Sequence, residues 1–465
     1  MPGPQSVTLP SLPTDFQRKI AMYRSSPPST LRLIPLLLAL AGTTASVQAQ
    51  SLVDLYTAAR GFDASYQSAK SQYDASLARG EQAKAGMLPT VGLSAVASQT
   101  TQDSSISSQN RTYNTQSATI AASQPLYRPV NWANYEQGKK QLDLAQAQLL
   151  QAEQDLIVRV SQAYFDVLAS TDTLAFVRSQ KAAVAEQLAS AKRNFEVGTS
   201  TITDSREAQA RFDLVVAQEL AADNDLRVKK IALNQLVGQA NAEPKPLLAP
   251  VQLKEVEPAD VDQWVRQSES SHPGLKQLEV ALDVAKLETQ KAQAGHKPTL
   301  DLTGSYTSVN NNGSSTSSSD VRINQGVIGL SFNLPLFAGF AVQNRVRETL
   351  ALEDKARTDL EASKRTVAQG ARTAYFGVQS GLGQVKAFEA AEASSQSALD
   401  ANKLGYQVGV RINIDVLNSQ SQLFDTKAKL AKARYDVLMG GLKLRQASGT
   451  LKADDLQPVN ALLAK

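Results

Sequence analysis

One long helical pattern dominates the sequence and covers residues 131–197. These roughly 67 residues contain one glycine, Gly138, and no proline. Apolar residues recur every seven positions in two series: Leu142, Leu149, Leu156 and Ala163, and then Val160, Val167 and Leu174. At about 1.5 Å per residue, the pattern predicts a helix roughly 100 Å long. A rod of this length is typical of coiled-coil assemblies rather than of a compact globule.

The same stretch returns later in the chain, which weakens the interpretation as a simple dimeric coiled coil. Matching residues lie 211 positions apart: Ala163-Tyr164-Phe165 and Ala374-Tyr375-Phe376, Phe195 and Tyr406, Asp204 and Asp415, and Gly238 and Gly449. Pro125-Leu126-Tyr127 recurs as Pro335-Leu336-Phe337 at a displacement of 210. So long a period indicates a duplicated half-protein. It predicts two structural repeats, residues 50–250 and 251–465.

Each predicted repeat contains two strands between helical segments. In the first, alternation of apolar and polar residues predicts strands near 91–97 and 112–124, joined by a polar loop at 98–111. In the second, strands near 300–306 and 321–334 flank the loop 310–319. The predicted helices cover 51–86, 131–197 and 204–236, then 260–295, a second long helix ending near 407, and 415–447.

The helix lengths predict how the elements pack. In each repeat, two helices of roughly 33 and 35 residues together match the long helix, so they are expected to stack end to end alongside it. Each chain then supplies four strands. Four strands do not close a barrel that spans a bilayer, and open sheet edges are not tolerated in lipid. The pattern therefore predicts a mixed α and β membrane protein that must oligomerise.

The N-terminal segment has the features of a secretory signal peptide. Arg32 precedes an apolar run at 33–41, and Val47-Gln48-Ala49 forms a cleavage site of the small-x-small type. The sequence thus predicts a signal peptide at 1–49, with Met22 as an alternative start. Beyond it, no run of 18 apolar residues predicts a transmembrane helix.

Composition excludes several kinds of site. The chain has no cysteine and two histidines, His272 and His296, which are expected at the surface. No disulfide or Cys/His metal site is therefore expected, and no Ser/His/Asp set that would indicate an enzyme can be assembled. The leader carries four basic residues and one acid, which leaves 44 basic and 43 acidic residues. So balanced a charge disfavours a nucleic-acid partner. No cofactor is expected.

Several motifs resemble the TolC family of outer-membrane efflux and secretion ducts over nearly the whole mature length. They are Pro125-Leu126-Tyr127 and the runs at 194–204 (NFEVGTSTITD), 405–415 (GYQVGVRINID) and 433–451 (ARYDVLMGGLKLRQASGTL). The resemblance implies a homotrimer with a twelve-stranded transmembrane β-barrel in outer-membrane lipid and a twelve-helix α-barrel that crosses the periplasm. It also implies two partners, a periplasmic adaptor protein and an inner-membrane transporter, which hand over substrates for export.

The resemblance also implies a gate at the helical turns. Asp415 matches an acidic constriction, and Asn418 stands where close relatives carry a second aspartate, so only a weak cation block is expected at Asp415. Thr203, Asp204, Tyr406 and Arg411 match a latch that holds the tunnel closed, in which Arg411 is expected to bridge to Asp204.

A structural alternative exists for the acids of this gate. Asp204 and Asp415 both begin helices, where a carboxylate caps free N–H groups and suits the helix dipole. Arg411 replaces Ser200 in the repeat, so the duplicated fold itself does not require an arginine there.

Two other classes of function compete with the export duct. A periplasmic adaptor, or another structural coiled-coil protein, explains the long helices but not the paired hairpins. The other class, a secreted enzyme, is not supported by any residues of the sequence.

Overall fold

The computed structural model describes residues 49–464 except 105, 106 and 249. Apart from Ala49, the predicted signal peptide lies outside the described residues. The first half contains α1 (Leu52–Phe62), α2 (Ala64–Ala85), β1 (Thr90–Ser104), β2 (Ser107–Tyr127), α3 (Pro129–Glu196) and α4 (Ile202–Val237). The second contains α5 (Val261–Ser271), α6 (Pro273–Ala294), β3 (Thr299–Asn312), β4 (Asp320–Asn333), α7 (Ala341–Gln407) and α8 (Asn413–Ala447). A short 3₁₀ turn (Ala453–Asp455) and α9 (Leu456–Asn460) follow.

The element lengths repeat between the two halves. Helices α1 and α2 have 11 and 22 residues, as do α5 and α6. The long helices α3 and α7 have 68 and 67 residues, and α4 and α8 have 36 and 35. The predicted long helices are therefore confirmed, and their ends agree with the prediction within a few residues.

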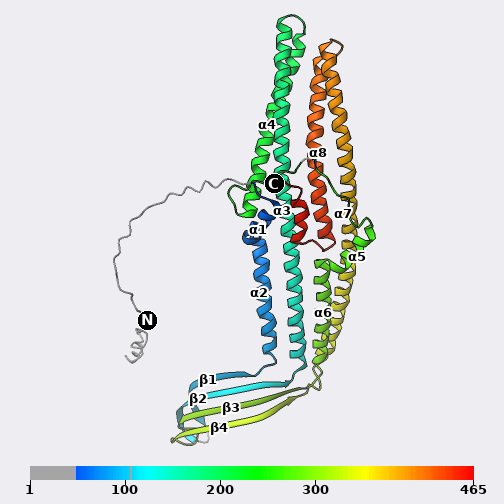
Figure 1. The fold of residues 1–465 in the computed structure, drawn as a ribbon. Coiled ribbons are helices and arrows are strands. Elements are labelled where there is room, and N and C mark those ends of the chain that lie inside the picture. The colour runs from blue at the N-terminus through cyan, green and yellow to red at the C-terminus, as the bar shows by residue number, and fades with distance from the viewer. Residues whose placement is uncertain (1–48, 105–106, 249, 465) are drawn as a thin grey trace, which may run out of the picture. The chain divides into compact units, whose positions relative to one another are not determined.

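The predicted end-to-end stacking is also confirmed. Helices α1, α2 and α4 pack along α3, while α5, α6 and α8 pack along α7. In Figure 1, α2 lies beside the part of α3 nearest the strands, and α4 lies beside the other part. Contacts of α3 with α6 and α8 join the two halves. No helix in the described part of the chain is long and apolar enough to cross a membrane.

The predicted single helices at 51–86 and 260–295 are wrong, because each is broken after 11 residues. The first break is at Asp63, whose carboxylate accepts a hydrogen bond of 2.8 Å from the Tyr66 N–H and so caps α2. Arg159 of α3 holds the same carboxylate with two bonds of 2.8 and 2.9 Å. The second break is at His272, before Pro273, which has no N–H to continue the helix.

His272 is not the surface residue that the sequence suggests. It is half-buried, and its Nδ1 accepts a hydrogen bond of 3.1 Å from the Gly274 N–H, which caps α6. Burial lowers the pKa of His272 from its ordinary value. Protonation would remove the acceptor and place a cation at the positive end of a helix.

We predict that His272 makes the protein less stable at mildly acidic pH. Because its pKa is lowered in the folded chain, the unfolded chain takes up the proton first as the pH falls below about 6.5. The stabilisation, about 1 kcal/mol for a cap, is complete above that pH and is lost as the pH falls through the folded pKa. Thermal unfolding in detergent at pH 8 and pH 5.5 measures it. His272→Asn keeps a capping acceptor that does not titrate, so it should lose less stability than the wild type. Equal losses would contradict the prediction.

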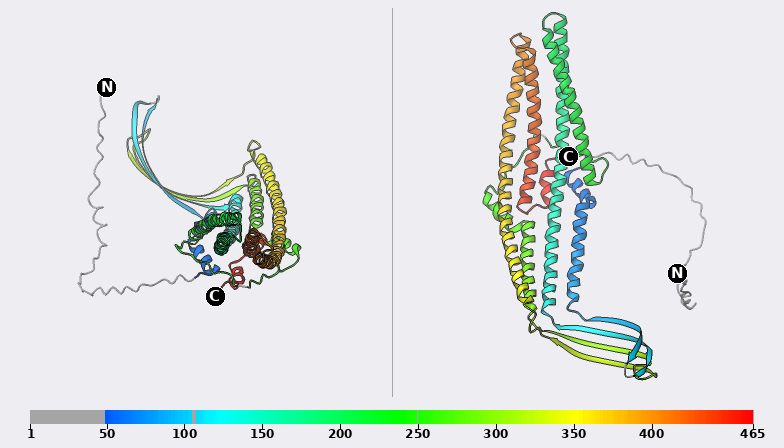
Figure 2. Two further views of the ribbon diagram at one scale, coloured as in Figure 1. Left: turned by 90° about the horizontal axis from the view of Figure 1, so that it is seen from above. Right: turned by 180° about the vertical axis from the view of Figure 1, so that it is seen from behind.

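The four strands form one antiparallel sheet in the order β1-β2-β3-β4, so β1 and β4 are its edges. The register places Leu93 opposite Ile120 and Ile120 opposite Tyr306. Because side chains alternate between faces, these residues share one apolar face with Ile328, Leu330 and Phe332. The other face is mostly polar but also carries Val96, Ile323 and Val327, and its Thr119 and Thr307 hydroxyls lie 3.0 Å apart. Figure 2 shows the sheet curving away from the helices.

The predicted polar loop at 98–111 is wrong for most of its length. Strand β1 continues to Ser104 and β2 begins at Ser107, and the hydroxyls of Thr101 and Thr112 lie 3.1 Å apart. The ladder is made by backbone groups, so polar side chains do not end it, and threonine favours strands. The second loop is shorter than predicted, at 313–319.

The largest apolar core surrounds the middle of α3. It collects buried residues of α1, α3, α4 and α8: Leu52, Leu55, Leu156, Val160, Tyr164, Phe165, Leu233 and Met439 among them. The ring of Phe165 lies 5.6 Å from that of Tyr164 and 5.8 Å from that of Tyr435. The C-terminal segment, which the sequence did not predict, adds Leu456, Val459 and Leu463 to this core.

Candidate functional site

The candidate site lies at the turns 197–201 and 408–412, at the end of the helices opposite the sheet (Figure 1). We call these the first and second tips. Each turn begins in the same way, with a glycine in the left-handed region: Gly198 has a φ of 80° and Gly409 a φ of 78°. Other residues adopt this conformation only with strain, which explains why both repeats carry glycine there.

At the first tip, Asp204 is held within its own turn. One carboxylate oxygen accepts hydrogen bonds of 2.7 Å from the Ser200 hydroxyl, 3.0 Å from the Thr201 N–H and 2.9 Å from the Thr201 hydroxyl. In return, the Thr201 hydroxyl accepts from the Asp204 N–H at 3.2 Å. The Ser200 hydrogen bond and those of Thr201 lower the pKa of Asp204. Asp204 therefore completes a capping box at the start of α4.

At the second tip, Asp415 does not cap its helix. The residue before α8 is Ile412, whose side chain has no acceptor, and the Asp415 carboxylate instead pairs with Arg411 at 3.6 Å. Their side chains are 58% and 34% exposed. The capping alternative thus holds for Asp204. Asp415 makes no cap, although it lies in the first turn of α8, where a carboxylate suits the helix dipole. Arg411 takes the place that Ser200 has at the first tip, four residues before the aspartate.

The other predicted latch residues are distributed over both tips. The Tyr406 hydroxyl accepts a hydrogen bond of 3.3 Å from the Asn194 side chain, and its ring packs with Leu399, Val416 and Leu423. Thr203 is exposed. Among the described residues, no ion pair joins Arg411 to Asp204. Within one chain, the Tyr406 side chain therefore links the tips, whereas the polar groups of the Arg411 and Asp204 side chains pair only with residues of their own tips.

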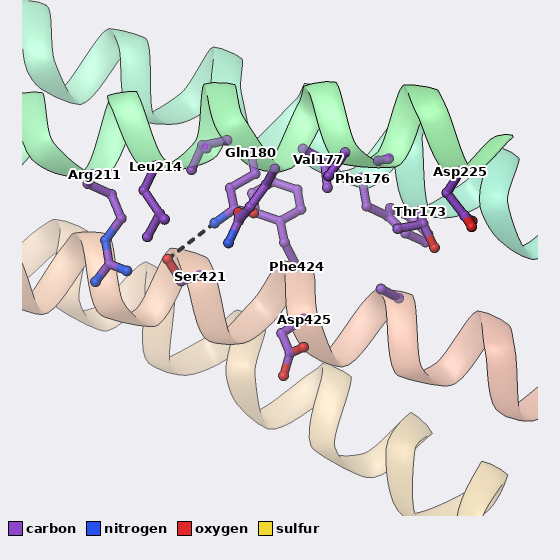
Figure 3. A pocket seen from close by; sticks show the side chains of 15 residues that line it. Thr173, Phe176, Val177, Gln180, Arg211, Leu214, Asp225, Ser421, Phe424 and Asp425 are labelled. Carbon is purple, nitrogen blue, oxygen red and sulfur yellow. Dashed lines mark hydrogen bonds between the residues drawn. The ribbon is translucent and has the colours of Figure 1, made fainter. Parts of the chain in front are cut away.

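Sequence reasoning missed a series of polar bonds between the tips. Gln187 donates to the side chain of Asn413, which is 1% exposed, and the Asn413 amide lies 3.5 Å from the Asp204 carbonyl oxygen. Gln180 donates to the Ser421 hydroxyl at 3.2 Å (Figure 3). Gln180, Gln187 and Asn194 are seven residues apart, so they share one face of α3. The recurrence of side-chain amides every seven residues could have predicted these polar bonds from the sequence.

A groove separates α3 and α4 from α8 next to these bonds. Its volume is 570 Å³, and Phe176, Leu214 and Phe424 line it together with polar residues (Figure 3). Arg211 of α4 reaches across it and donates a hydrogen bond of 2.7 Å to the Asn418 side chain. In the part of the chain that the structure describes, no group of three or more His, Cys, Asp or Glu residues could hold a metal ion.

Comparison with known protein families decides the class of protein. The model of the family described as outer membrane efflux protein matches residues 55–239 and again 264–450. The chain belongs to the outer membrane efflux protein family. It is accordingly an exit duct of the outer membrane with a part that extends into the periplasm. The alternative of a periplasmic adaptor or structural coiled-coil protein is excluded.

Individual outer membrane efflux proteins and their relatives agree with this assignment. The outer membrane protein TolC of Vibrio cholerae serotype O1 is 34% identical over 437 residues, which cover 92% of this chain and 98% of that protein. The alkaline protease secretion protein AprF of Pseudomonas aeruginosa is 31% identical over 359 residues, which cover 76% of this chain and 73% of that protein. The crystal structure of the outer membrane protein VceC of Vibrio cholerae matches the fold with a TM-score of 0.73 at 18% identity. The match covers 86% of this chain and 96% of VceC. None of these three proteins is named as an enzyme.

Proposed function

We propose that three copies of this chain form one duct, whose twelve strands close a β-barrel in the outer membrane. The observation that supports this most strongly is the sheet, which has a face with the large apolar residues near the helices, a mostly polar face and two open edges. A membrane barrel needs lipid on its apolar side, water on its polar side and a partner for every edge. Four strands do not suffice, and the resemblance to the family supplies the number three.

The helices would form the periplasmic part of the same duct. Each half, residues 50–250 and 251–465, contributes one long helix flanked by stacked shorter helices, which fits an origin by duplication. Helix α7 buries fewer residues than α3 within one chain, although it is equally long. Its exposed surface includes small residues such as Gly370, Gly377 and Ala387, at which a helix of a neighbouring chain could approach closely.

The tips would form the gate. Three copies of Asp415 would face one another at the narrow end, with Asn418 beside them as an uncharged position. Thr203, Asp204, Tyr406 and Arg411 would latch the tips, and Arg411 would exchange its Asp415 partner for Asp204 of a neighbouring turn in the closed trimer. The first tip, fixed by a capping box, would stay in place while the uncapped second tip moves.

The partners would be an inner-membrane transporter and a periplasmic adaptor that docks at the tips. Alkaline protease secretion protein AprF and proteases secretion protein PrtF are named for secretion, whereas BepC is named as an outer membrane efflux protein. Both kinds of relative support a duct that serves efflux or type I secretion. Fractionation tests the proposal: a heat-modifiable trimer in the outer membrane is expected. A monomeric rod in the soluble periplasm would contradict it.

We predict that the loop 313–319 faces the cell exterior. Ser315→Cys creates the only cysteine in the chain, so an impermeant thiol reagent should label it on intact cells. Val410→Cys, at an exposed position of the second tip, is the matched control and should react only after the outer membrane is opened. Labelling of Val410→Cys but not of Ser315→Cys on intact cells would invert the proposed topology.

A further inference from the structure

Arg211 has an unusual environment next to the proposed constriction. It lies on α4, which belongs to the first half, but its side chain reaches toward α8 in the second half (Figure 3). There, Nη2 donates a hydrogen bond of 2.7 Å to the Asn418 amide oxygen. Among the described residues, no carboxylate forms an ion pair with Arg211. Its positive charge is therefore held in place by a neutral side chain.

The position of Asn418 brings this charge close to the acid of the constriction. Asp415 and Asn418 are three residues apart on α8, so their side chains share one face of the helix. A guanidinium bonded to Asn418 then lies within about one Debye length, 10 Å at 0.1 M salt, of the Asp415 carboxylate. Arg411 contacts the same carboxylate at 3.6 Å. Two guanidinium groups therefore lie near each Asp415 carboxylate: that of Arg411 in the same tip and that of Arg211 from the other half of the chain.

We propose that Arg211 is a specificity-determining residue of the duct, because it weakens the binding of cations at Asp415 and occupies the side chain at position 418. The inference rests on the proposed constriction at Asp415. A cation that approaches Asp415 meets the repulsion of Arg211 in each of the three chains. A polyvalent cation feels it most, since Coulomb energy scales with the charge. The hydrogen bond to Asn418 holds the guanidinium at this place.

Block of the single-channel current by Mg²⁺ in planar bilayers at 0.1 M salt tests the role of the charge. Arg211→Gln keeps a donor for Asn418 but loses the charge, and it should tighten the block about threefold to tenfold. Arg211→Lys keeps the charge and should block like the wild type. If Arg211 had only a structural role, the charge of the residue at position 211 would not affect the block. Equal block in wild type, Arg211→Gln and Arg211→Lys would therefore overturn the proposal.

A second arm tests whether Arg211 occupies position 418. In Asn418→Asp, the new carboxylate should pair with Arg211, so the block tightens only moderately. In the double variant with Arg211→Gln, both acids are available to the ion, and the block should tighten by more than the product of the single effects. Simple multiplication would contradict the direct contact.

The reference variant Asp415→Ala distinguishes the role of Arg211 from the existence of the constriction at Asp415. If it relieves the block while the Arg211 variants change nothing, the constriction stands and the role of Arg211 is wrong. If Asp415→Ala also leaves the block unchanged, the proposed constriction is wrong as well.

Discussion

Replacing Arg411 by serine together with Tyr406 by phenylalanine should raise the single-channel conductance of the assembled protein several-fold. The first change removes the guanidinium that, in the proposed closed trimer, pairs with Asp204 of a neighbouring turn, and the second removes the hydroxyl that accepts from Asn194. An exposed ion pair contributes about 0–1 kcal/mol and a neutral hydrogen bond about 1 kcal/mol, so each chain loses roughly 1–2 kcal/mol of closing energy. In the proposed trimer, the losses of the three chains would add.

The two substitutions are designed to leave the fold intact. Serine and phenylalanine are the residues that the first tip carries at the matching positions, Ser200 and Phe195. The double variant thus gives the second tip side chains that a similar turn already accommodates. Arg206→Ser, at an exposed position of α4, is the control and should leave the conductance unchanged. Unchanged conductance in correctly assembled Arg411→Ser/Tyr406→Phe trimers would show that Arg411 and Tyr406 do not hold the proposed gate closed.

The largest loss of stability is expected from Phe165→Ala. Phe165 is 2% exposed, and its ring packs between α3 and α8 against Tyr435. Replacing a buried phenylalanine by alanine costs about 3–5 kcal/mol, because the cavity closes only in part. Since the C-terminal segment packs into the same core, it should loosen together with the helices. Thermal unfolding and the yield of outer-membrane trimer measure the effect.

The repeat offers a matched control for this prediction. Phe376 is the counterpart of Phe165 but is 53% exposed in the chain. Phe376→Ala removes the same atoms from a side chain that is half-exposed within one chain, so it should cost the fold of that chain clearly less than Phe165→Ala. Equal losses from the two substitutions would contradict the assignment of the core to the surroundings of Phe165.

The long helices were predictable because their heptads extend over many turns and because Gly198 and Gly409 mark their ends. The breaks at Asp63 and His272 were not, because the helical pattern continues across them and each break depends on one capping side chain. The strands extend through a polar segment, since backbone bonds rather than apolar residues hold that ladder together.

The contacts at the tips were predictable only in part. The two matching turns located the tips, but the partner of Arg411 did not follow from the sequence. A flexible arginine at that position can reach either aspartate, and only the geometry of the single chain assigns Asp415 to it. The bonds from Gln187 and Arg211 to α8 are contacts between the two halves, which no local pattern reveals.

A reversible cross-link between the tips tests most directly that this chain is a duct whose gate opens when the tips part. Because the chain has no cysteine, Asn194→Cys with Tyr406→Cys provides one reactive pair per chain, to be combined with Arg411→Ser. In planar bilayers, this variant should conduct strongly before treatment. Its conductance should fall when a reducible bis-maleimide joins the tips and rise again on reduction. Conductance that stays high although the cross-link has formed would contradict the account.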